Sequence, residues 1–461
     1  MTPSFADRCA AILGPAHVIT EASALAEYGQ DALQIGHPPD LVVIPANSAE
    51  ISEIVRACDA DRVPLVVRGA GSGYTGGAVP VRGGVVLSME RLNRIIAIDD
   101  ENLIAVVQPN VITGDLQDAV ESRGLFYPPD PASLRQSSLG GNVAENAGGP
   151  RAVKYGTTRR YVLALEAVLP TGEIVRTGSK AVKNVVGYDL TQLLVGSEGT
   201  LAIITEITLR LIPKPRVQSV LQATFADIAT AVRAVSALLA ASVLPATIEV
   251  IDRLSLSAVT RRLGRAVAPD NTGAMLIIEV DGASAGVEED STRVLEACRT
   301  AGALGVRRAV SDAERDAVWE ARRELSFALR ALAPRKINHD VVVPRGRVPQ
   351  LFELVERLRK ESGLMIPCFG HAGDGNIHVN VMCDPADPEQ MRHAKAVERA
   401  LFEGVVALEG SISGEHGIGF SKAPYLGIEL SADVIALMRR IKFAFDPHGI
   451  LNPGKMWEYQ P

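Results

Sequence analysis

The first 215 residues combine short apolar runs with one clear amphipathic period. Residues 41–45 form an apolar run that predicts a buried strand, and residues 48–61 carry apolar side chains at helical spacing behind a serine. Residues 64–68 form a second apolar run, so the pattern predicts a β-α-β unit, with helices expected before it over residues 1–36. A strand is expected again at 78–89 and at 202–212.

From residue 216 to about residue 414 the pattern changes to strands that alternate with amphipathic helices. Strands are predicted at 217–225, 247–251, 274–280, 340–343, 364–369 and 377–382, and helices at 228–241, 285–300, 312–332, 348–362 and 389–408. This alternation is typical of an α+β domain, an antiparallel sheet covered by helices. The Pro-Lys-Pro run at 213–215 marks the boundary before it, and the turn-rich tail at 447–455 is expected to return to the first domain.

Three glycine-rich blocks interrupt the first part of the chain. Residues 69–77 read GAGSGYTGG, and so many glycines leave backbone N–H groups free to converge on an anion. A dinucleotide-binding Rossmann fingerprint needs a helix directly after the glycines, whereas a strand is expected here, so a different nucleotide fold is favoured. The blocks at 127–149 and 196–201 are also rich in small residues, which allow backbone to approach a flat or extended ligand closely. A flexible surface loop is the alternative.

The segment 367–380, PCFGHAGDGNIHVN, predicts a β-hairpin that brings two histidines together. The dipeptide Asp374-Gly375 favours a two-residue turn. A turn centred there pairs His371 directly with His378, with Cβ atoms about 5 Å apart on one face. Asn380 lies two residues further along the strand and therefore on the same face.

The later run GEHG offers further ligands for the same site. Glycines on both sides of Glu415-His416 free the backbone to bend, so both side chains could reach the two histidines. One carboxylate and two imidazoles give three protein ligands and an open position, as catalytic metal sites have, and suit Zn²⁺, Mn²⁺ or Fe²⁺. His416 then remains as a general base. Half-buried structural histidines are the alternative.

Composition narrows the class of protein. A chain of 461 residues is expected to form two or three domains, and its net charge of -7 argues against a general nucleic-acid binder. Five scattered cysteines without a CxxC pair suit a reducing compartment and offer no iron–sulfur site. Neither a signal peptide nor an apolar run of about 20 residues is read, so a cytoplasmic protein without a transmembrane segment is expected, with peripheral docking at the inner face of the membrane left open.

The ordered motifs of the chain resemble a known family over nearly its whole length. These motifs are RGAGSGYTGG, PPDPAS, GGNVAENAGG, VGSEGTLAIITE, GHAGDGNIHVN, GEHG and LNPGK. They are similar to those of the FAD-linked D-2-hydroxyacid dehydrogenases of the vanillyl-alcohol-oxidase (PCMH-type) superfamily. The resemblance implies a PCMH-type FAD-binding domain at 1–215, a substrate or cap domain with the metal site at 216–424, and a C-terminal segment at 425–461 that packs back on the FAD domain.

The resemblance also implies the residues that hold FAD. The first glycine loop would cradle the pyrophosphate, the second block would line the flavin, and the third block and the tail would close over the cofactor. The implied FAD-binding residues are Arg68, Gly69, Ala70, Gly71, Ser72, Gly73, Thr75, Gly76, Pro129, Asp130, Ser137, Ser138, Gly141, Asn142, Gly148, Glu198, Gly199, Ile204 and Asn452. The three glycine blocks contain neither a His nor a Cys, which relatives with covalent flavin use, so non-covalent FAD is expected. Ala202 stands where relatives often have Gly.

On the substrate side, the resemblance carries over the metal ligands His371, His378 and Glu415 and the base His416. Asn380 would contact the substrate or support the site from behind. Arg322 matches the arginine that binds the substrate carboxylate, although the adjacent Arg323 could take that role, and Lys336 is a second candidate for this contact. For Arg322 and Lys336 a solvated helix or strand face is the alternative.

The expected activity is oxidation of a small D-2-hydroxy acid, D-lactate or glycolate, to the 2-oxo acid with hydride transfer to FAD. Electrons would pass to an external acceptor: a quinone, an electron-transfer flavoprotein, a cytochrome or a partner subunit. The chain would work as a homodimer or within a larger complex. Alternatives are a D-2-hydroxyglutarate or D-malate dehydrogenase, an alcohol or sugar oxidase on the same fold, a metal hydrolase, and a non-catalytic flavin-binding subunit.

Overall fold

The computed structural model describes residues 4–457, which form two compact units. The first unit contains the described residues up to Gly148, Thr157–Lys214 and the described residues from Glu415 onward. The second unit contains Gly149–Gly156 and Pro215–Gly414. This division places 149–156 with the second unit and 415–424 with the first, whereas the sequence suggested the opposite for both segments.

The first unit contains a small mixed sheet with the order β1-β2-β4-β3, in which β2, β4 and β3 run parallel. Its strands are β1 (Val18–Ile19), β2 (Leu41–Val43), β3 (Leu65–Arg68) and β4 (Val85–Ser88). Helix α3 (Ser48–Asp61) connects β2 to β3 as predicted, and its residues Ile51, Ile54, Val55 and Cys58 join one core cluster with α1 (Phe5–Leu13). The strand expected at 78–89 is shorter, because residues 80–84 make turns before β4 begins.

A second, antiparallel sheet of the first unit has the order β5-β6-β10-β8-β9. Its strands are β5 (Ile95–Asp99), β6 (Ile104–Val107), β8 (Val162–Val168), β9 (Ile174–Gly178) and β10 (Ile203–Arg210). The other elements of this unit are α2 (Ala22–Tyr28), α4 (Thr113–Glu121), α5 (Leu139–Glu145), α7 (Leu190–Leu194), α15 (Leu426–Glu429), α16 (Ala432–Phe445) and the short pair β7 (Leu125–Phe126) and β11 (Ile212–Pro213).

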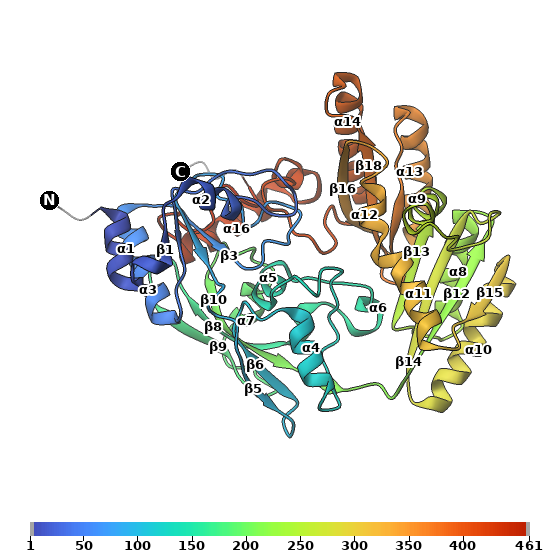
Figure 1. The fold of residues 1–461 in the computed structure, drawn as a ribbon, viewed down its shortest axis with the longest axis horizontal. Coiled ribbons are helices and arrows are strands. Elements are labelled where there is room, and N and C mark those ends of the chain that lie inside the picture. The colour runs from blue at the N-terminus through green and yellow to red at the C-terminus, as the bar shows by residue number, and fades with distance from the viewer. Residues whose placement is uncertain (1–3, 458–461) are drawn as a thin grey trace. The chain divides into compact units, whose positions relative to one another are not determined.

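The second unit is built on a seven-stranded sheet whose neighbouring strands are all antiparallel, in the order β15-β12-β14-β13-β17-β18-β16 (Figure 1). Its strands are β12 (Val217–Phe225), β13 (Thr247–Asp252), β14 (Ala274–Gly282), β15 (Gly305–Arg308), β16 (Arg335–Val342), β17 (Cys368–His371) and β18 (Asn376–Cys383). Its helices are α6 (Ala152–Tyr155), α8 (Ile228–Ala240), α9 (Arg253–Leu263), α10 (Ser284–Thr300), α11 (Asp312–Arg323), α12 (Leu325–Leu329), α13 (Val348–Ser362) and α14 (Pro388–Ala407). The α+β class predicted from the pattern is confirmed.

The histidines lie on the face of this sheet that packs against helices. Ile251, Met275, Ile277 and Phe369 pack on α9, α11 and α12 in a single apolar cluster. Because side chains alternate along a strand, His371 follows Phe369 on this same face.

The single helix expected at 312–332 is divided at Glu324 into α11 and α12.

The predicted register of the β17–β18 hairpin is wrong by two residues. His371 lies opposite Asn376, and Phe369 lies opposite His378. The turn uses four residues instead of two, because the N–H groups of Asp374 and Gly375 both donate to the carbonyl of His371, at 3.3 and 3.1 Å. A shift of two residues leaves every side chain on its face, so the two imidazoles still adjoin, with ring centroids 5.4 Å apart.

Candidate flavin and metal site

The first glycine loop follows β3 and requires glycine for two physical reasons. Gly71 and Gly76 have φ values of +66° and +81°, in the left-handed region that favours glycine. A Cβ atom on Gly69 would lie 2.4 Å from Ser138 Oγ, and one on Gly76 would lie 2.0 Å from the Phe420 ring. The loop backbone is therefore pressed against its neighbours, and the residues that follow it make turns rather than a helix. This arrangement fits the predicted phosphate cradle.

The second glycine block meets that loop at the start of α5. Ser138 caps this helix, and its Oγ accepts from the N–H groups of Gly141 and Ala70 at 3.3 and 3.4 Å. The neighbouring Ser137 and the side chain of Asn142 both contact Thr113 Oγ1, at 3.1 and 2.7 Å. Residues predicted from the first and second glycine blocks to hold FAD are therefore joined by hydrogen bonds.

The third block and the C-terminal tail join the same group. Asn452 is 3 % exposed, and its side-chain amide donates to the carbonyls of Gly77 and Glu198, at 3.1 and 2.8 Å. The carboxylate of Glu198 accepts from the N–H groups of Ile418 and Gly419, at 2.8 and 2.6 Å. Glu198 thus connects the third block to the loop that carries Glu415 and His416.

Titratable side chains in the interior accompany this cradle, and the sequence did not indicate their burial. Burial, and then the nearby carboxylates of Glu198 and Asp31, raise the pKa of Glu145 well above its ordinary value. Burial also raises the pKa of Glu198, although the N–H groups that it accepts oppose this change. Burial lowers the pKa of Lys455 to about 8. Glu145 lies within GGNVAENAGG, but only tertiary burial distinguishes it from a surface glutamate.

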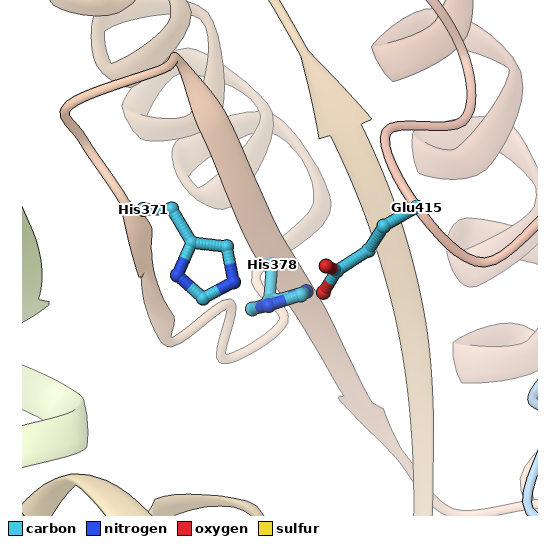
Figure 2. Close-up of side chains that lie close together, drawn as sticks. All are labelled: His371, His378 and Glu415. Atoms are coloured by element: carbon cyan, nitrogen blue, oxygen red, sulfur yellow. The ribbon is translucent and has the colours of Figure 1, made fainter. Parts of the chain in front are cut away.

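The predicted ligands His371, His378 and Glu415 come together (Figure 2), with one ligand atom from each residue within 4.8 Å of the others. The two histidines are buried on adjacent strands. Glu415 follows Gly414, whose N–H donates to the carboxylate of Asp340 on β16 at 3.0 Å. Two imidazoles and a carboxylate fit a divalent cation that keeps open coordination positions.

His416, the predicted base, has a defined place beside the glycine loop. Its ring stacks on Tyr74 with a centroid distance of 5.3 Å, and its carbonyl accepts from Thr75 Oγ1 at 3.0 Å. Its Nε2 lies 4.0 Å from Glu415 Oε1. The imidazole is therefore held between a residue of the flavin cradle and a predicted metal ligand.

The two arginines of α11 have different environments. Arg322 is 7 % exposed, whereas Arg323 is exposed and donates to the carbonyl of Asp316 at 3.4 Å. Arg322 Nε donates to the carboxylate of Glu249, and the guanidinium lies 4.7 Å from the centroid of the Phe369 ring. Of the two candidates, Arg322 is therefore the one that faces the interior.

Lys336 and Asn380 lie on the neighbouring strands β16 and β18. Lys336 Nζ donates to Ser326 Oγ at 2.7 Å. Asn380 is fully buried, and its amide donates to the carbonyls of Pro367 and His378, at 3.2 and 3.1 Å. These bonds fit support of the His378 strand, the second of the two roles expected for Asn380.

Two buried carboxylates behind the metal trio, Glu249 and Asp340, were not predicted as functional residues. Both are fully buried. The only signal in the sequence was an acidic residue inside or beside an apolar strand, in TIEVID and HDVVV. Such a residue is costly to bury unless it is paired, so its strand context could have marked it.

Comparison with known proteins first defines the class. Residues 39–178 match the family model described as "FAD binding domain", and residues 214–456 match "FAD linked oxidases, C-terminal domain". The structure resembles p-cresol methylhydroxylase, with a TM-score of 0.82 at 19 % identity over 98 % of this chain and 96 % of that chain. The fold is therefore PCMH-type, and the cofactor is FAD.

Curated relatives then give the family. The chain is 44 % identical to the glycolate oxidase subunit GlcD of Bacillus subtilis, over 93 % of this chain and 92 % of the relative. It is 36 % identical to a D-lactate dehydrogenase of Anaerostipes hadrus, over 91 % and 89 % of the two chains. The protein belongs to the FAD-linked oxidase family that contains these proteins, and it is an oxidoreductase. The resemblance read from its motifs is confirmed.

Among residues 4–457, every helix is too short or too polar to cross a membrane.

Proposed function

We propose that the protein oxidises a small D-2-hydroxy acid, D-lactate or glycolate, to the corresponding 2-oxo acid. The observation that supports this most directly is the group of His371, His378 and Glu415 in a chain of the FAD-linked oxidase family. Relatives named glycolate oxidase subunit and D-lactate dehydrogenase indicate the same substrate class.

The roles of the side chains follow from their chemistry. His416 takes the proton of the α-hydroxyl group, a step in which a positioned base contributes about 10²–10⁴-fold. Its stacking on Tyr74 restricts the rotation of the ring. Arg322, through its remaining N–H groups, and Lys336 hold the substrate carboxylate and thereby orient the Cα–H bond. Asn380 supports the strand of His378.

FAD and a divalent metal would supply the hydride acceptor and the Lewis acid that the side chains lack. FAD would be held without a covalent bond by the three glycine blocks and Asn452, and when bound it would supply the hydride acceptor. A divalent metal would be held by His371, His378 and Glu415, with Zn²⁺ favoured over Mn²⁺ or Fe²⁺, and would supply electrostatic stabilisation that lowers the pKa of the hydroxyl group.

Electrons then leave for an external acceptor: a quinone, an electron-transfer flavoprotein, a cytochrome or a partner subunit. The name of the Bacillus subtilis relative describes it as a subunit, which favours a place for this chain in a larger complex. We place the protein in the cytoplasm, with peripheral docking at the inner face of the membrane as an alternative.

A larger 2-hydroxy acid, D-2-hydroxyglutarate or D-malate, is the second candidate. The observation that favours it is a second cation, the half-buried Lys336, in addition to the buried Arg322, since a second carboxylate would need its own partner. An alcohol or sugar oxidase on the same fold is less well supported, because such an enzyme has no need of the metal trio.

Anaerobic bleaching of the flavin tests the proposal. D-lactate, L-lactate, glycolate and D-2-hydroxyglutarate are each added before and after treatment with a chelator. We expect D-lactate or glycolate to bleach the flavin, the chelator to stop this, and added metal to restore it. Bleaching by D-2-hydroxyglutarate alone would support the second candidate, and bleaching that survives complete metal removal would contradict the role of the trio.

The titration of Lys336 is expected to make KM for the hydroxy acid depend on pH. Burial, with the nearby charge of Arg330, lowers the pKa of Lys336 to about 8. The cationic form is therefore lost as the pH rises through 8, and KM for the hydroxy acid should rise over the same range. Steady-state kinetics between about pH 6.5 and 9.5 would measure this, since an ordinary lysine titrates near 10.4.

The variants Lys336→Arg and Lys336→Met provide the control for that measurement. Arginine stays charged at all of these pH values, so KM should remain flat. Methionine removes the charge, so KM should be high throughout. A rise of KM that is equal in the wild type and in Lys336→Arg would assign the titration to another group.

A further inference from the structure

Glu249 connects the metal trio to the inner face of α11. It lies on β13 directly opposite His371 of β17, so the two side chains share one face of the sheet. Glu249 is fully buried, and its Oε1 is hydrogen-bonded to His371 Nδ1. In Figure 2 the other ring nitrogen of His371 points toward His378 and Glu415.

The second oxygen of Glu249 is held from the opposite side. Oε2 accepts from Arg322 Nε, and Arg322 is itself packed against the Phe369 ring. A carboxylate that accepts from a guanidinium is held in its ionised form by the adjacent positive charge. The carboxylate is therefore an ionised acceptor with a fixed orientation.

An ionised acceptor at Nδ1 determines which nitrogen of a neutral imidazole carries the proton. With the proton on Nδ1, the lone pair is on Nε2, the nitrogen that faces the trio. Carboxylates in this position behind a metal-binding histidine fix the ring and increase its basicity. The corresponding distance behind His378, from Nδ1 to Asp340 Oδ1, is 3.9 Å and beyond hydrogen-bond range.

We propose that Glu249 is the positioning residue of the metal site: it holds His371 in the tautomer that offers Nε2 to the cation, and Arg322 holds Glu249. The inference rests on the metal site of the proposed function. It also gives Arg322 a second task. Within residues 4–457, Arg322 Nη2 is buried without a hydrogen bond, so the same guanidinium that braces Glu249 keeps one group for a substrate carboxylate.

Zinc affinity measures the first consequence. The FAD-loaded, metal-free protein is titrated with Zn²⁺ in competition with a chromogenic chelator. We expect Glu249→Gln to bind Zn²⁺ about 10–100-fold more weakly than wild type, as is typical for loss of such a carboxylate. The matched control is Glu398→Gln, since Glu398 Oε1 lies 3.7 Å from Nδ1 of His339, a histidine outside the trio, and its loss should leave Zn²⁺ affinity unchanged.

A second variant guards against failure to fold. Glu249→Gln leaves Arg322 buried without its charged partner, whereas Glu249→Leu combined with Arg322→Met removes both charges and the acceptor. The ¹⁵N shifts of the histidine rings in the metal-free protein then report the tautomer. We expect His371 to be Nδ1-protonated in the wild type, and the double variant to lose this preference and to bind Zn²⁺ at least tenfold more weakly.

Two results would contradict either the positioning role of Glu249 or the metal site itself. Unchanged Zn²⁺ affinity in both Glu249 variants, with the His371 tautomer preserved, would overturn the positioning role. If the wild type binds neither Zn²⁺ nor Mn²⁺, the metal site of the proposed function fails instead. The tautomer of His371 in metal-free protein then decides separately whether Glu249 orients that ring.

Discussion

Replacing His416 with Asn is expected to slow anaerobic flavin reduction by about 10²–10⁴-fold, the usual contribution of a positioned general base. FAD content should stay at the wild-type level, because the hydrogen bond from Thr75 goes to the backbone carbonyl of His416, which the substitution retains. Stopped-flow measurement at saturating substrate gives the reduction rate directly. The metal content should also persist, since His416 is not one of the three predicted ligands.

The control is His37→Asn, which changes an exposed histidine of the first unit. Its reduction rate should equal that of the wild type. A His416→Asn protein that is reduced within a factor of about three of the wild-type rate would show that another group takes the proton. Loss of FAD from the variant would instead indicate that the ring supports the cradle through its stacking on Tyr74.

The double substitution of His371 and His378 by Asn is expected to reduce bound metal to below about one tenth of the wild-type content, because a single carboxylate remains. Flavin reduction by the hydroxy acid should fall by about 10³-fold, which corresponds to about 4 kcal/mol of lost stabilisation. Elemental analysis and the flavin spectrum measure the two effects on one sample. The glycine loops that fit FAD belong to the first unit, so the protein should remain yellow.

His393→Asn is the matched control, since His393 lies on α14, outside the metal trio. Its Nδ1 is hydrogen-bonded to the carbonyl of Ser362 at 3.0 Å. It should keep both its metal and its reduction rate. Metal that survives the double substitution would place the ion elsewhere. Thermal unfolding of each variant, followed by circular dichroism, separates loss of metal from loss of the fold.

Local pattern was sufficient for much of the fold. The bounds of α3, α13 and β12 agree with the predictions, because each helix buries one regularly spaced face and β12 is a continuous run that is buried on both faces from Ser219 onward. The α+β class and the FAD-linked family could likewise be read from the pattern and the ordered motifs. Element bounds, fold class and family motifs depend on residues that are close together in the sequence, so they can be predicted from it.

The β17–β18 hairpin shows most clearly which features local sequence determines and which depend on the folded structure. The sequence placed His371 and His378 on one face, because side-chain alternation has a period of two and a register error of two residues preserves it. It gave the wrong pairing, because turn length depends on hydrogen bonds that only the folded turn makes. The two rings are therefore close, as predicted, although the predicted register was wrong by two residues.

Only the tertiary structure decided what surrounds the site. Glu249 and Arg322 are 73 positions apart, and Glu249 and His371 are 122 positions apart, so no local pattern connects them. Their meeting depends on the order of the strands and on the packing of α11 over the sheet. The sequence determined which residues could carry the chemistry, and long-range strand pairing decided which buried carboxylate supports them.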